Sequence, residues 1–147
     1  MAKHFLIIEA RFYPDISDEL AKGAIAELDR RGATWERRQV PGVLEIPAAL
    51  AMAARGAAKR HDGYVLLGCV IRGETSHYDI VANESARAIM DFAVANALAV
   101  GNSILTVENG AQAWARAKVD QKNKGAAAAA AAFDMATLRE ELGLADG

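Results

Sequence analysis

Segments with the pattern of strands and of helices alternate four times along this chain of 147 residues, and this alternation restricts the possible folds most strongly. Parallel neighbours in a sheet need crossover helices between them, and right-handed crossovers leave few topologies. The pattern therefore predicts an α/β fold, a three-layer αβα sandwich with a four-stranded parallel flavodoxin-like sheet and helices on both faces. Strands are predicted at His4–Ala10, Ala33–Val40, Tyr64–Leu67 and Ser103–Val107.

Capping residues and breakers predict where the intervening helices begin and end. Asp15 or Ser17 is expected to cap a first helix that runs to about Arg31, and capping-box spacing at Ser76–Asp79 and Asn109–Gln112 marks two further starts. The seven alanines at 126–132 favour a closely packed helix over disorder, because alanine is the best helix former. The remaining helices are predicted over residues 46–60, 78–100 (with Gly101 as the stop) and 124–142.

Size and composition exclude several classes of protein. The length indicates one domain over residues 1–147, and a net charge of −2 gives no electrostatic case for nucleic acid or an anionic membrane. The start of the chain lacks a signal-peptide pattern, and the single cysteine, Cys69, suits a reducing cytoplasm. The histidines His4, His61 and His77 are scattered, so no metal site is expected. Phosphate-binding and dinucleotide-binding glycine motifs are absent.

Residues 68–79 join the third predicted strand to the following helix and contain the densest set of reactive groups. In parallel α/β sheets, ligands bind just outside the carboxyl ends of the strands. The N–H groups that open a helix attract anions, above all phosphate. Thr75 adds a hydroxyl, and His77 would lie beside the anion as a group that exchanges protons near neutral pH. An acid–base role for His77 is favoured over the alternative of a core histidine.

The other candidates are ambiguous when taken singly. Phe12 could stack on a flat ring or belong to a core or interface, and Gly42 could allow close approach of a ligand or simply turn the chain. Glu45 could complement a helix dipole or accept hydrogen bonds from hydroxyls. Arg72 could bind phosphate or form an ion pair that holds its loop, whereas Cys69 is expected to be a small buried residue and not a nucleophile.

A basic turn precedes the last predicted helix. It contains Lys122 and Lys124, and Arg116 lies about two helical turns earlier. From spacing alone, a solvated charge cluster is the favoured interpretation.

Several separated segments occur in a characteristic order: Ala10-Arg11-Phe12, Val40-Pro41-Gly42 with Glu45-Ile46-Pro47, Gly68 through His77, Leu105-Thr106 with Glu108-Asn109, and Asn123-Lys124-Gly125-Ala126. From Phe5 to about Leu142 the chain resembles the 6,7-dimethyl-8-ribityllumazine synthase family of riboflavin biosynthesis. The resemblance implies condensation of 5-amino-6-(ribitylamino)uracil with 3,4-dihydroxy-2-butanone 4-phosphate. Phosphate and water leave, and the family uses no cofactor or metal.

The resemblance also implies roles for individual residues. His77 would be the general acid and base, Phe12 would stack on the uracil ring, and Glu74 and Thr75 would hold the phosphate, mainly through N–H groups. The implied contacts to the ribityl chain and pyrimidine come from Gly42, Val43, Leu44, Glu45, Cys69, Val70 and Ile71.

A homo-oligomer with sites between adjacent subunits is part of the same resemblance. Arg116 would reach the phosphate and Lys124 the heterocycle from the neighbouring subunit. Asn102 and Leu44 stand where the family often has aromatic residues. Residues 118–123 lack two glycines of the Gly-Thr-Lys-x-Gly-Asn stretch found in shell-forming members. A pentamer, or a decamer of two pentamers, is therefore expected in place of a shell of sixty subunits.

Two other functions are compatible with such a sequence. The first is a flavin- or riboflavin-binding module of the same fold without turnover. Asn102 and Leu44, which replace aromatic residues common in the family, are compatible with this alternative. The second is a scaffold protein with a decayed pocket, which the presence of Phe12, Glu45 and His77 disfavours.

Overall fold

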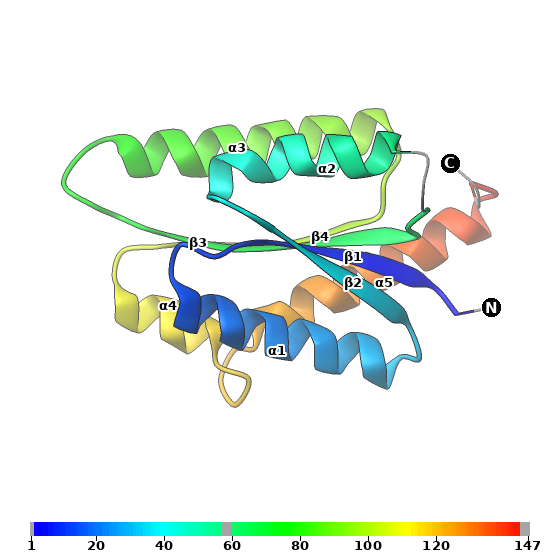
Figure 1. The fold of residues 1–147 in the computed structure, drawn as a ribbon, viewed down its shortest axis with the longest axis horizontal. Helices are drawn as coiled ribbons and strands as arrows, with labels where there is room; N and C mark the ends of the chain where they lie inside the picture. Colours follow the sequence, from blue (N-terminus) through cyan, green and yellow to red (C-terminus); the bar gives the residue numbers. More distant parts are fainter. Residues whose placement is uncertain (1, 57–59, 145–147) are drawn as a thin grey trace.

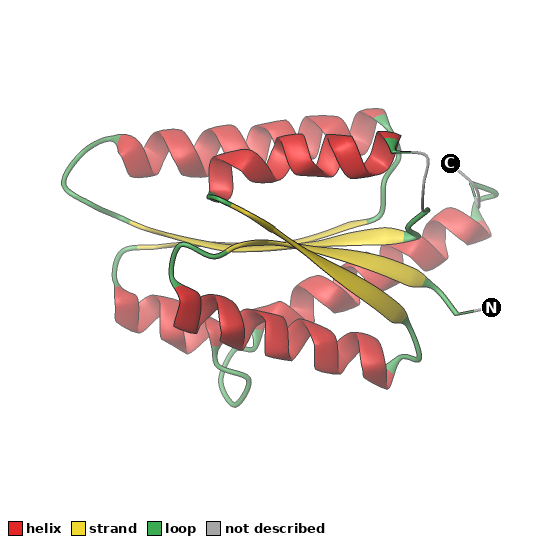
Figure 2. Cartoon of the chain, viewed as in Figure 1, coloured by secondary structure: helices red, strands yellow, loops and turns green. Residues whose placement is uncertain are grey.

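The computed structural model describes residues 2–56 and 60–144, and its described part confirms the predicted α/β architecture. The sheet has four parallel strands in the order β2-β1-β3-β4. Helices cover both faces of the sheet, which gives three layers (Figures 1 and 2). The strands are β1 (His4–Ala10), β2 (Thr34–Val40), β3 (Gly63–Ile71) and β4 (Val100–Val107).

Two groups of helices form the outer layers (Figure 1). One layer contains α1 (Pro14–Arg30), α4 (Gly110–Ala117) and α5 (Lys124–Glu141). The other contains the short 3₁₀ helix η1 (Val43–Glu45), α2 (Ile46–Arg55) and α3 (His77–Ala95). Within the described ranges, no helix combines the length and apolar character needed to cross a bilayer.

The two central strands are buried on both faces, which explains their uninterrupted apolar sequence. Phe5 and Ile7 of β1 pack toward the layer of α1 and α5, whereas Leu6 and Ile8 pack toward the layer of α2 and α3. Glu9 is 1% exposed in this setting and accepts hydrogen bonds from the guanidinium groups of Arg11 and Arg37. The buried carboxylate is therefore paired, as a charge inside a protein must be.

The alanine-rich segment forms α5, as predicted, and its small residues let it approach the sheet closely. Ala128, Ala129 and Ala132 are buried against the core. Gly101 lies beside this helix, and a Cβ atom built on it would be 1.7 Å from the carbonyl oxygen of Ala128. The prediction that Gly101 ends a helix was therefore wrong, because this glycine lies inside β4 and makes room for α5.

The boundary between α3 and β4 also differs from its prediction. The helix ends at Ala95 instead of near Val100, and the strand begins at Val100 instead of Ser103. The Asn96 side-chain amide donates to the carbonyl of Phe92, and Ala97 turns the chain with φ 51°. The apolar residues 98–100 fit either a helix or a strand, so periodicity could not place this boundary.

Two other helix ends needed correction. Tyr13 is the residue before α1 and Pro14 is its first residue, so neither Asp15 nor Ser17 caps the helix; the Ser17 hydroxyl instead donates to the carbonyl of Ala10. Helix α2 ends at Arg55, followed by extended Gly56. The predicted extension of α2 falls partly on residues 57–59, outside the described residues, and Arg60 beyond them is not helical.

Candidate active site

A pocket of about 420 Å³ opens at the carboxyl ends of the strands, where the sequence predicted a ligand site. Its lining comes from the segments after β1, β2 and β3, from the end of β3 and from the first turns of α3. Its lining consists of Phe12, Tyr13, Gly42, Val43, Leu44, Glu45, Cys69, Val70, Ile71, Gly73, Thr75, His77, Tyr78 and Val81.

Phe12 presents an aromatic ring to this pocket from the loop between β1 and α1. The side chain is 71% exposed, and its ring meets that of Tyr13 edge to face with centroids 4.9 Å apart. This exposure excludes the predicted core position within the described residues, whereas stacking on a ligand and an interface position both stay compatible with it. An exposed ring held by a neighbouring aromatic can stack on a flat heterocycle.

The segment after β2 contributes η1 to the pocket wall. Val43 is buried and anchors the turn, while Leu44 and Glu45 are exposed. The N–H of Glu45 donates to the carbonyl of Gly42, and a Cβ atom on Gly42 would lie 3.1 Å from the Glu45 carboxylate. Glu45 immediately precedes α2, and its side chain accepts no capping hydrogen bond within the described residues. Its carboxylate can therefore accept hydrogen bonds from ligand hydroxyls in the pocket.

The end of β3 supplies Cys69, Val70 and Ile71 to the pocket floor. Cys69 is 5% exposed, and burial raises the pKa of its thiol to about 11. Burial has this effect because a thiolate loses hydration that an apolar setting does not replace. Cys69 is thus a protonated wall residue, which agrees with the prediction that it is not a nucleophile.

The pKa of Cys69 leads to a prediction about its alkylation. Roughly one thiol in a thousand is ionised at pH 8 when the pKa is about 11, so iodoacetamide should react at least about a hundredfold more slowly with the folded chain than with the denatured chain. The rate should rise about tenfold per pH unit up to about pH 11, because only the thiolate attacks. Mass spectrometry of timed samples measures this, and equal rates for folded and denatured chains would contradict it.

Thr75 in the loop from β3 to α3 and His77 at the start of α3 both line the pocket. This loop extends beyond the end of the sheet (Figure 1). His77 is the first residue of α3, and its side chain is exposed, which argues against a core role. The predicted capping box at Ser76 is not formed: Ser76 precedes the helix but its hydroxyl caps nothing in the described chain. The Thr75 hydroxyl instead accepts a hydrogen bond of 3.3 Å from the N–H of His77.

Arg72 holds this loop through ion pairs. Its guanidinium group lies 3.0 Å from the Glu108 carboxylate and 3.4 Å from that of Asp79, and it stacks over the Tyr78 ring at 4.2 Å. Of the two predicted roles, the structure supports the ion pair. The same contacts partly neutralise Asp79, which would otherwise repel an anion at the start of α3.

Four candidate residues lie outside the lining of this pocket. Glu74 is exposed in the β3–α3 loop, and Asn102 lines a separate groove of about 440 Å³ between α3 and α5 along the edge strand β4. Arg116 donates to the carbonyl of Gln112 within α4. Lys124 is the exposed first residue of α5, and its carbonyl accepts from the Ser103 hydroxyl. Within one chain, the side chains of Asn102, Arg116 and Lys124 therefore lie outside the pocket.

Four lining residues were missed by sequence reasoning: Tyr13, Gly73, Tyr78 and Val81. Tyr13, Gly73 and Tyr78 lie next to or close to predicted candidates in the chain, so proximity was a usable signal. Val81 lies four residues after His77, and residues with this spacing share one face of a helix. Burial raises the pKa of the Tyr13 hydroxyl, so it remains a neutral donor beside the pocket.

Comparisons with known proteins agree on one family. The family model described as 6,7-dimethyl-8-ribityllumazine synthase matches residues 2–140. A protein of that name from Bartonella henselae is 56% identical over 140 residues, which cover 95% of this chain and 90% of the relative. The protein from Agrobacterium fabrum is 56% identical over 143 residues, covering 95% and 97%.

A third relative, from Rhizobium meliloti, is named 6,7-dimethyl-8-ribityllumazine synthase 1 and is 58% identical over 143 residues, covering 95% of this chain and 94% of its own. These matches include the pocket, the loop with His77 and the start of α5. The chain belongs to the 6,7-dimethyl-8-ribityllumazine synthase family.

Proposed function

We propose that this protein condenses 5-amino-6-(ribitylamino)uracil with 3,4-dihydroxy-2-butanone 4-phosphate to 6,7-dimethyl-8-ribityllumazine, releasing phosphate and water. The observation that carries the proposal is the pocket that unites Phe12, Glu45 and His77 in a chain of this family. An aromatic ring, a hydroxyl acceptor and an acid–base group suit a flat heterocycle with a polyol side chain and a reaction with several proton transfers. We place the enzyme in the cytoplasm, where a free thiol such as Cys69 stays reduced.

The phosphate-bearing substrate is proposed to bind at the start of α3. Helix starts bind anions because their first N–H groups lack partners inside the helix. Thr75 adds a hydroxyl there, and Glu74 contributes its backbone N–H. Elimination of phosphate requires a proton to leave carbon and a dianion to be stabilised as it departs. His77, the first residue of α3, follows Thr75 by two residues, so it can serve the proton transfers.

Arg116, Lys124 and Asn102 are proposed to complete the pocket of a neighbouring subunit. Support comes from their separation from the pocket within one chain and from the exposed apolar groove beside Asn102. Met90 and Val94 are 64% and 72% exposed in that groove, and an exposed apolar surface of this kind is typical of protein interfaces. We propose a pentamer or a pair of pentamers. Light scattering should give about five or ten times 15.6 kDa, and a mass near a megadalton would overturn this assembly.

Removal of the His77 imidazole should slow the reaction without abolishing it. Acid–base catalysis contributes on the order of a hundredfold or more, but holding two reactive molecules together supplies part of the rate by itself. The His77→Ala protein is therefore expected to lose roughly tenfold to a hundredfold in kcat. Stopped-flow detection of the lumazine chromophore measures it. A loss below about threefold, with unchanged substrate affinity, would remove the acid–base role.

The function itself is tested by mixing the two substrates and recording the lumazine chromophore and inorganic phosphate together. Equal molar yields of both products are expected. Tight binding of riboflavin with no turnover would instead favour the flavin-binding module. Uracil substrate consumed without phosphate release would exclude the proposed elimination.

A further inference from the structure

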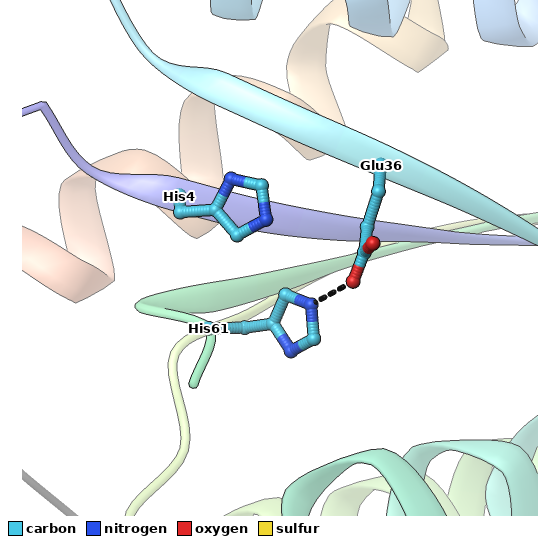
Figure 3. Close-up of side chains that lie close together, drawn as sticks. All are labelled: His4, Glu36 and His61. Carbon is cyan, nitrogen blue, oxygen red and sulfur yellow. Dashed lines mark hydrogen bonds and ion pairs between the residues drawn. The ribbon is translucent and has the colours of Figure 1, made fainter. Parts of the chain in front are cut away.

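Three side chains far apart in the sequence meet at the amino-terminal edge of the sheet, away from the pocket. His4 comes from the start of β1, Glu36 from β2, and His61 from the segment before β3 (Figure 3). Their nitrogen and carboxylate oxygen atoms all lie within 4.8 Å of one another. The expectation of scattered histidines was therefore wrong for His4 and His61, because parallel strands bring their starting residues to one edge.

Both imidazole rings are directed toward the Glu36 carboxylate (Figure 3). The Nε2 atom of His61 lies 2.6 Å from Oε1 of Glu36, and the two rings stack with centroids 5.3 Å apart and planes 18° apart. Zinc binds histidine nitrogen and carboxylate oxygen at about 2.0–2.2 Å, which separates neighbouring ligand atoms by about 3.3 Å. The ligand atoms of the cluster are separated by 2.6 Å for His61 and Glu36 and by no more than 4.8 Å for any pair. Small side-chain rotations would therefore bring them to coordinating distances.

The hydroxyl of Thr34 orients the imidazole ring of His4. The Nδ1 atom of His4 lies 2.7 Å from Oγ1 of Thr34, and that hydroxyl is within 3.5 Å of the Lys3 carbonyl, to which it can donate. When Thr34 donates to Lys3, it accepts the proton of Nδ1, and the neutral ring then carries its lone pair on Nε2. Metal-binding histidines are oriented and held in one tautomer by partners of this kind.

The backbone holds the two histidines in place. The N–H of Asp62 donates to the carbonyl of His4, and the N–H of His4 donates to the Asp62 carboxylate, both at 2.7 Å. His4 is also paired with Thr34 in the β1–β2 register. The geometry of the cluster is therefore set before any ion arrives, which lowers the cost of binding.

Burial and charge also suit a cation. The side chains of His61 and Glu36 are 6% and 21% exposed, so an ion would be partly shielded from water but could still keep one water ligand. Arg38 approaches the Glu36 carboxylate at 3.7 Å, but its side chain is 66% exposed, and an exposed ion pair of this length is weak. This contact with Arg38 would therefore oppose a cation at Glu36 weakly.

We propose that His4, Glu36 and His61 bind a divalent transition-metal ion, with Zn²⁺ the best fit to two imidazoles and a carboxylate. The fourth position would hold water. Because the ion would join β1, β2 and the segment before β3, its effect is to stabilise this edge of the sheet. This inference does not depend on the proposed reaction, since the site and the pocket lie at opposite ends of the strands.

The test begins with the full-length, chelator-treated protein. Titration with zinc chloride is expected to give one Zn²⁺ per chain and a rise in Tm, and Co²⁺ should produce the visible absorption of a four- or five-coordinate ion. The variants Glu36→Gln and His61→Gln should each raise the Kd for Zn²⁺ by about a hundredfold, because each loses a direct ligand. Thr34→Val should raise it roughly tenfold, because it removes only the orienting hydroxyl.

His77→Gln is the matched control, because it removes the third histidine of the chain from a distant position and should leave the Kd for Zn²⁺ unchanged. Circular dichroism in chelator establishes that each variant is folded. If a ligand variant fails to fold, the wild-type Co²⁺ spectrum and Thr34→Val decide. Absence of stoichiometric zinc binding by the wild-type protein would overturn the proposal. So would an affinity that Glu36→Gln, His61→Gln and Thr34→Val all leave unchanged.

Discussion

Replacement of Arg116 by alanine is expected to lower kcat/KM by about a hundredfold or more, because one charged donor to a leaving group contributes on this order. The side chain is half-buried on α4, and among the described residues its guanidinium donates to the Gln112 carbonyl of its own helix, so in the proposed assembly its other donors would serve the phosphate. Steady-state kinetics with varied 3,4-dihydroxy-2-butanone 4-phosphate measure the loss. Arg116→Lys should restore part of it, because it keeps the charge but not the planar pair of donors.

Lys122→Ala is the matched control, since it removes an exposed positive charge from the following turn and should leave kcat/KM nearly unchanged. Co-expression of Arg116→Ala chains with His77→Ala chains tests whether the site is shared. In a random mixed ring, roughly a quarter of the interfaces would combine an intact His77 with an intact Arg116. Activity well above that of either variant alone is expected, and activity equal to their average would exclude a shared site.

Replacement of Gly125 by alanine is expected to destabilise the fold by about 3 kcal/mol or more. A Cβ atom at this position would lie 2.0 Å from the carbonyl oxygen of Leu20 and 2.9 Å from its carbonyl carbon. These are backbone atoms of α1, so α1 and α5 would have to separate. Alanine normally stabilises a helix relative to glycine by only about 1 kcal/mol, so the clash outweighs this gain and the substitution lowers the free energy of unfolding.

Urea denaturation at one fixed protein concentration measures this change, since assembly contributes to apparent stability. Gly110→Ala is the matched control: it also lies in the first turn of a helix, but a Cβ atom there has no atom of another described segment within 4 Å. Its effect should stay within about 0.5 kcal/mol. An equally small change for Gly125→Ala would show that α5 can shift away without loss of packing.

The sequence by itself determined the architecture and the position of the pocket. Strand and helix patterns alternate because buried parallel strands are continuously apolar, whereas helices that cover a sheet are apolar on one side only. Since parallel strands end at one edge, Phe12, Glu45 and His77 could be assigned to one site before any coordinates were known. The capping prediction at Asn109 was also confirmed, because its side chain accepts a hydrogen bond from the N–H of Gln112.

Tertiary structure alone decided the features that depend on close approach between distant segments. Periodicity could not place the end of α3, because residues 98–100 suit a helix or a strand, and only the packing of α5 against Gly101 explains why that glycine lies in β4. The same holds for His4, Glu36 and His61, which are isolated in the sequence and adjacent in the fold. Spacing along a chain reports on neighbours within one helix or strand, whereas sheet register sets which residues from different strands meet.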